Sequence, residues 1–183
     1  NLFRKALTTT ILLATTSALV SPLIFSLIAY ILVRTKLPGR WALDLVIWGS
    51  GAVPGILSGL GLLWLFLGRP FLNWMYGTIY ALLLVVAIQG NTTGTNIMKG
   101  VFIQVGSDME EAARVSGAGF FRTYFRIWIP LLMPSLILLG TMNFVVAAGT
   151  TSSIILIASR GTMTLSLLAL EFADPSVGLR EEA

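Results

Sequence analysis

Long apolar runs separated by short polar breaks constrain this chain more than any other feature. A helix needs about 17–25 mostly apolar residues to cross the hydrocarbon core of a bilayer, and runs near that length cover residues 6–33, 43–67, 71–88 and 131–148. Lipid offers the backbone no hydrogen-bond partners, so each run must satisfy its own amides as a helix. The sequence therefore predicts an all-α, polytopic membrane helix bundle, a single transmembrane domain over residues 1–183 with four spans.

The tail has apolar pieces at residues 154–158 and 165–170, which are too short to span a bilayer. The chain also opens without a starting Met, and no apolar run follows its last residues. We expect it to be a fragment of a longer protein, with a fifth span beyond its last residue.

The composition excludes most soluble and catalytic classes. Apolar residues make up 56% of the chain and charged residues only 11%, too few to cover a water-soluble domain. Histidine and cysteine are absent from the sequence, so imidazole bases, thiolate nucleophiles and the commonest metal ligands are missing. We expect no catalytic residues, no metal and no cofactor. The twelve Lys and Arg residues lie at the ends of apolar runs, which indicates a lipid bilayer as the partner and not nucleic acid.

Proline and glycine mark the second run. Pro54 should kink this helix because it lacks an amide hydrogen. Gly55 and Gly59 are four residues apart, with Gly61 beyond them, and small residues at this spacing let helices approach closely. We expect the polar, glycine-rich residues 90–106 not to span.

Cationic loops predict the orientation. Seven of the twelve cations fall in the loop at residues 34–40 and in residues 99–126. Cytoplasmic loops are enriched in Lys and Arg, so these two segments are predicted to lie inside. Two spans separate them, which requires that they share one side of the membrane.

The polar segment from residue 107 to residue 130 has the signals of a short helix and a bend. Ser107 and Glu110 fit a capping box, so a helix should begin at Asp108. Glu110 and Arg114 are four residues apart and can pair. Gly117 supplies a left-handed stop.

A second, interfacial helix is predicted over residues 120–129. At 100° per residue one broad arc is aromatic and apolar, and the opposite arc is polar. The apolar arc holds Phe120, Phe121, Tyr124, Phe125, Ile127 and Trp128, and the polar arc holds Arg122, Thr123 and Arg126. We interpret Arg122 and Arg126 as anchors to phospholipid headgroups. Pro130 is expected to end the segment.

This segment resembles the "EAA" loop of binding-protein-dependent ABC importer permeases. Glu111-Ala112-Ala113 is followed by Gly117 and then by Ile127 and Pro130, at the spacing typical of that loop. The departure is Ile129-Pro130, where the family usually has Leu-Pro. The resemblance implies an ATPase-coupling loop at about residues 107–130. Its expected site residues are Glu110, Glu111, Ala112, Ala113, Arg114, Gly117, Ile127 and Pro130.

The resemblance also implies partners and a location. In such importers ABC ATPase subunits hydrolyse ATP, a second permease half completes the pore, and an external solute-binding protein delivers the solute. We therefore expect a transporter subunit of the cell inner membrane, working by alternating access, and not an enzyme. The chain has no phosphate-binding loop of its own, because its glycine-rich strings lack the lysine and the strand–turn–helix context of such loops.

The sequence does not decide which solute is transported. Gly149-Thr150-Thr151 and the stretch from Gly161 to Ser166 are similar to permeases for ferric iron, spermidine or putrescine, thiamine, phosphonate and oxyanions. We take ferric iron as the first expectation within that group.

An alternative hypothesis from another functional class is a channel or a secondary carrier driven by an ion gradient. That rival predicts ionisable residues inside the spans, and these runs are almost free of charge. Gln89 and Asn143 are lone amides, which we interpret as hydrogen-bonding contacts between helices.

Overall fold

The computed structural model describes residues 2–106 and 108–173, and within these ranges it contains helices and no strands. The elements in chain order are α1 (Leu2–Arg34), α2 (Arg40–Ala52), α3 (Gly55–Gly68), a 3-10 turn (Asn73–Met75), α4 (Ile79–Gln104), α5 (Asp108–Val115), α6 (Phe120–Thr123), a π-helical segment (Tyr124–Trp128), α7 (Ile129–Gly149) and α8 (Leu165–Ala173). The all-α prediction is confirmed.

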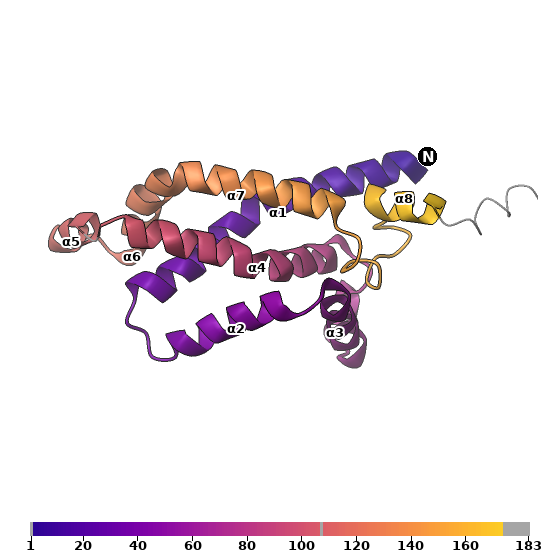
Figure 1. Ribbon diagram of the computed structural model, residues 1–183, viewed down its shortest axis with the longest axis horizontal. Coiled ribbons are helices and arrows are strands. Elements are labelled where there is room, and N and C mark those ends of the chain that lie inside the picture. The colour runs from indigo at the N-terminus through magenta and orange to yellow at the C-terminus, as the bar shows by residue number, and fades with distance from the viewer. Residues whose placement is uncertain (1, 107, 174–183) are drawn as a thin grey trace, which may run out of the picture.

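Helix α1 is the centre of the bundle. It packs along both α4 and α7, while α2 lies against the other side of α4 (Figure 1). Helix α5 projects at the end of the bundle that also holds the connection between α1 and α2, and α8 lies near the N-terminus at the opposite end (Figure 1). The two cationic segments therefore share one end, as predicted.

Two of the four expected spans are confirmed. Leu2–Arg34 and Phe120–Gly149 are long and apolar enough to cross a membrane, and the bent pair α2–α3 raises the number to three if it counts as one span. The last span begins at Phe120 and not at residue 131, because the chain stays helical through Pro130.

A π-helical turn explains how the helix continues through this proline. The amide of Ile129 donates to the carbonyl of Tyr124, five residues back, which widens the turn just before Pro130. Proline is tolerated near the start of a helical segment, since the amide that it lacks has no obligatory partner there. The predicted end at Pro130 is therefore wrong. The predicted polar arc is also wrong at Thr123, which is buried.

The second run is broken rather than straight. Helices α2 and α3 meet at Val53 and Pro54 with a bend of 113°. Val53 is extended (φ −85°, ψ 123°), the conformation favoured for a residue that precedes proline. The kink predicted at Pro54 is confirmed, and it is sharp enough that residues 43–67 form two helices.

The third run is displaced along the chain. Residues 71–78 form turns, and the helix runs from Ile79 to Gln104, through the polar stretch that we expected to stay outside the membrane. Helix α4 buries Val85, Met98 and Phe102 among its neighbours. This tertiary burial compensates for the Gly, Asn and Thr residues in its middle, which have weak helix propensity.

Glycines of α3 allow close contacts with α4 and with the turn around Ser153. A Cβ atom at Gly55 would lie 2.5 Å from the Gln89 side chain, and one at Gly59 would overlap the backbone carbonyl of Ser153. In lipid such close approach is a main source of helix–helix attraction. Gly61, on the same helix, has open space around it.

Gly59→Ala should therefore destabilise the protein and Gly61→Ala should not. The added methyl at residue 59 meets backbone, which cannot rotate away, and overpacking of this kind costs about 1–3 kcal/mol. Thermal unfolding of the two variants in the same detergent measures the difference. Equal midpoints for both variants would contradict the packing of α3 against the segment around Ser153.

Candidate coupling site

Helix α5 ends as the sequence predicted. Gly117 has φ +77°, in the left-handed region, and the amide of Ala118 donates to the carbonyl of Ala113 at 2.9 Å. This six-to-one bond is typical of a Schellman motif, in which glycine relieves the strain of the turn. The chain thus reverses sharply between α5 and α6.

Glu110 anchors α5 to the bundle. Its side chain is only 5% exposed, and Oε1 accepts a hydrogen bond of 2.9 Å from the Tyr30 hydroxyl of α1. A buried carboxylate is tolerated only when donors satisfy it. The contact therefore joins two segments that lie 80 residues apart in the chain.

Tyr30 lies in a cluster of aromatic rings. Its ring centroid lies between 5.4 and 6.1 Å from those of Phe102, Phe120, Tyr124 and Trp128, all edge to face. The Tyr124 hydroxyl lies 2.6 Å from the Ser26 hydroxyl of α1. Each edge-to-face pair adds about 0.5–1.5 kcal/mol beyond area burial, so the cluster holds α1, α4 and the π-helical segment together.

Arg34, one turn after Tyr30, binds the end of α4. Its Nη2 donates to the carbonyl of Phe102 at 2.7 Å and to the carbonyl of Val105, and its guanidinium carbon lies 5.0 Å from the Trp128 ring centroid. The last carbonyls of a helix have no intrahelical partners and carry partial negative charge, which a cation stabilises. Arg34 therefore ties the start of the α4–α5 connection to α1.

The predicted site residues divide between two faces of α5. Glu110 and Ala113 are buried against the bundle, whereas Glu111 and Ala112 are exposed. The capping box depends on Ser107, and the Glu110–Arg114 pair depends on the Arg114 side chain; both lie outside the described parts of the chain. The exposed face is the part of α5 that another protein can reach.

Ile127 and Pro130 belong to the long helix from Phe120 to Gly149 and not to α5. Ile127 is half-buried in the π-helical segment, and Pro130 is exposed near the start of α7. Arg122 and Arg126 are both exposed, in agreement with the headgroup interpretation. The predicted loop residues thus lie on two helices, the projecting α5 and the long helix that follows it.

The sequence interpretation missed Tyr30 and Arg34. Both lie at the end of the first apolar run, and Arg34 was treated only as a flanking cation. The available signal was their one-turn spacing, which places an aromatic ring and a guanidinium on one face of the helix. Their partners, Phe102 and Trp128, lie far away in the chain and could not be assigned by spacing.

Residues 10–178 match the family described as "Binding-protein-dependent transport system inner membrane component". The chain belongs to this family. The chain is therefore a permease component of the inner membrane, a transporter subunit and not an enzyme.

Several curated relatives are permease proteins. The chain is 30% identical over 159 residues to a "Probable sulfate transport system permease protein" of Marchantia polymorpha, covering 82% of this chain and 55% of that protein. It is 28% identical over 176 residues to a molybdate/tungstate transport system permease protein of Pyrococcus abyssi, covering 96% and 68%. This permease chain thus spans between about half and two thirds of the length of these relatives.

One solved structure shares the fold of this permease component. It is the crystal structure of a bacterial ABC transporter involved in the import of the acidic polysaccharide alginate, with a TM-score of 0.73 and 20% identity. The match covers 93% of this chain and 59% of the other. At this identity the similarity is one of fold.

Tyr30→Phe should loosen α5 without disturbing the aromatic cluster. The variant keeps the ring and removes one donor from a buried carboxylate, which costs about 1–3 kcal/mol. Hydrogen exchange at the amides of residues 109–115 should accelerate by about tenfold or more. Tyr80→Phe is the control, because Tyr80 is 60% exposed on α4. Unchanged exchange in Tyr30→Phe would contradict the anchoring role of this hydroxyl.

Proposed function

We propose that this chain is the permease part of an ABC importer and that α5 receives the motion of an ATPase subunit. The observation that supports this most is the geometry of α5. The helix projects from one end of the bundle (Figure 1), with one face anchored by Glu110 and the other exposing Glu111 and Ala112. The segment at residues 107–130 is the proposed coupling loop.

Three separate connections would transmit a displacement of α5. The Glu110–Tyr30 hydrogen bond leads to α1, the Arg34 contacts lead to the end of α4, and the helix from Phe120 to Gly149 leads directly into α7. Since α1 packs against both α4 and α7, a push on α5 reaches all three helices together. This is the mechanical requirement of alternating access.

The partners follow from the same proposal. ATP is hydrolysed by separate ATPase subunits that bind the exposed face of α5, so the α5 end lies in the cytoplasm. A second permease half completes the pore, and an external binding protein delivers the solute at the opposite end. The cations of residues 34–40 and 99–126 lie on the cytoplasmic side in this arrangement.

For the solute we propose an oxyanion such as sulfate or molybdate. The relatives named above carry sulfate or molybdate/tungstate in their names, and a molybdenum transport system permease protein of Escherichia coli strain K12 is also 28% identical over 131 residues. These relatives do not support ferric iron, our first expectation from the sequence. The oxyanion alternative agrees with them better.

Gly117→Asp should release the ATPase from the complete transporter. The substitution places a charged side chain at the bend of the coupling loop, in a conformation that L-residues rarely adopt. Co-purification with the ATPase, together with ATP-driven uptake, measures the effect, and we expect both to fall by at least about tenfold, a cost of about 1.4 kcal/mol.

Gly39→Asp is a matched control for this variant. Gly39 also has a positive φ, +87°, with open space around it, and it lies in the α1–α2 connection at the same end of the bundle. It should retain the ATPase. Loss of the ATPase from both variants, or from neither, would contradict the specific role of the loop at residues 107–130.

Uptake by cells tests the solute. Cells whose own permease gene is deleted and then restored should regain uptake of radiolabelled sulfate or molybdate, with no change in ferric iron uptake. Recovery of ferric iron uptake alone would overturn the oxyanion proposal and leave the coupling proposal intact. Uptake that follows an ion gradient without ATP would overturn both.

A further inference from the structure

The outer face of α4 is polar over a stretch where a lipid-facing helix would be apolar. Large exposed apolar side chains occur on α4 at Leu84 and again at Ile103, with none between them. Over a comparable length, α1 exposes seven such residues, from Ile11 to Leu27. Helix α4 lies alongside α1 and α7, so its middle is at the same depth as theirs (Figure 1).

Between Leu84 and Ile103 the outward-facing positions of α4 form one strip, mostly polar, which we call the open strip. It consists of Gln89, Thr93, Asn96 and Gly100, of which Thr93 is exposed and the other three are half-buried. At 100° per residue these four positions fall within about 60° of arc. They therefore face one direction along about three turns of helix.

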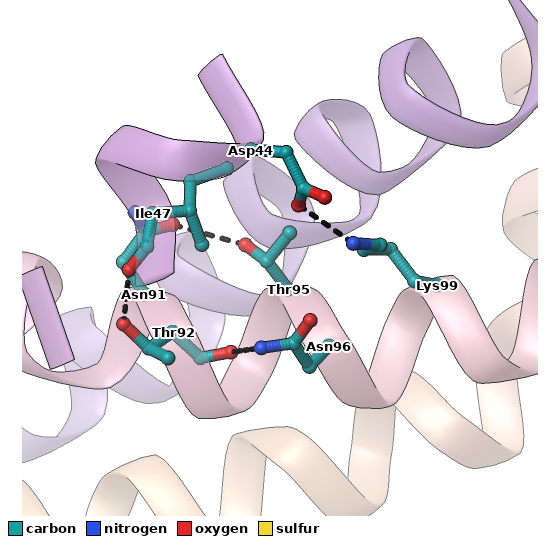
Figure 2. A network of polar contacts seen from close by, with 7 residues as sticks. All are labelled: Asp44, Ile47, Asn91, Thr92, Thr95, Asn96 and Lys99. Atoms are coloured by element: carbon teal, nitrogen blue, oxygen red, sulfur yellow. Dashed lines mark hydrogen bonds and ion pairs between the residues drawn. The ribbon is translucent and has the colours of Figure 1, made fainter. Parts of the chain in front are cut away.

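A second polar face of α4 is different, because α2 satisfies it. Lys99 forms an ion pair of 2.6 Å with Asp44, and the Thr92 hydroxyl donates to the carbonyl of Ile47 (Figure 2). Thr95 donates within α4 to Asn91 at 2.9 Å (Figure 2). These contacts explain polar residues between two helices, and they leave the open strip unexplained.

The open strip has few internal partners. Asn96 uses one amide hydrogen on the carbonyl of Thr92, at 2.9 Å, and Gln89 accepts from Ser153 at 3.0 Å. The Thr93 hydroxyl forms no hydrogen bond with the described residues. A polar group exposed to hydrocarbon costs several kcal/mol, so lipid is a poor neighbour for this strip.

A largely apolar pocket lies between the strip and α7. Gln89, Thr93 and Asn143 line a cavity of 240 Å³ together with Met142 and Val146 of α7. Gly90 and Gly94 form part of its wall on α4. Three polar side chains, Gln89, Thr93 and Asn143, are therefore among the residues that line this pocket.

We propose that the open strip lines the aqueous path of the solute. Its groups are neutral donors and acceptors, which can replace the hydration shell of an oxyanion without holding it as a fixed cation would. Among the described residues of α4 the only cation, Lys99, is neutralised by Asp44. This inference rests on the proposed function and adds to it the residues that the solute passes.

The absence of cysteine from the sequence makes the test direct. Thr93→Cys and Asn96→Cys are made singly in the complete transporter and treated with a negatively charged, membrane-impermeant methanethiosulfonate, with and without ATP. A thiol reacts as the thiolate, which forms in water and not in lipid. Val145→Cys on α7 and Leu19→Cys on α1 are the controls, because these apolar side chains are 69% and 67% exposed and are expected to face lipid.

Both strip variants should react at least about tenfold faster than both controls in one of the two nucleotide states, and excess sulfate or molybdate should slow the reaction. Strip cysteines that react no faster than the controls would overturn the inference. So would cysteines that stay unlabelled but cross-link between two copies, because the strip would then be an interface.

The labelling experiment and the uptake experiment test the two proposals independently. Fast labelling in a protein without ATP-driven uptake would keep the aqueous strip and reject the importer function. Normal ATP-driven uptake with an unlabelled strip would keep the importer function and reject this path.

Discussion

Helix α1 makes the contacts on which the rest of the bundle depends. Lipid tails are as apolar as leucine, so helices in a bilayer gain little from hydrophobic burial and associate through close packing and hydrogen bonds. The ring of Phe25 lies where a Cβ of Gly94 on α4 would be, and the carbonyl of Ala18 lies 2.9 Å from the position of a Cβ at Gly140 on α7. These approaches give α4 and α7 a common neighbour and fix their spacing.

The end of α1 serves a different purpose from its middle. There the contacts are polar and aromatic: Tyr30 satisfies the buried Glu110, and Arg34 binds the last carbonyls of α4 and lies against Trp128. Buried charged groups are costly when they lose a partner, so this cluster favours a single arrangement in which α5 is attached to the helices. The same end of α1 therefore joins the site where force is proposed to enter to the helices that must move.

Helix α4 combines two kinds of polar surface. One is closed by α2 through Lys99, Asp44 and Thr92, and contributes to the packing of the bundle. The other is open and bordered by a pocket at Asn143. Polar residues in a membrane helix are expensive unless protein or water meets them. Protein meets the first face of α4, and the second face is the one that we propose meets water.

Local energetics decided much of this protein from the sequence alone. The helical state of the apolar runs, the break at Pro54 and the left-handed turn at Gly117 follow from backbone hydrogen bonding and from residues with restricted or unusual φ, which act over a few positions. The extent of α4 and the π-helical turn before Pro130 depended on neighbours distant in the chain. So did the pairing of Tyr30 with Glu110, and for the same reason: a polar or strained segment is stable only when another helix supplies the partner, and the identity of that partner is a property of the packed bundle.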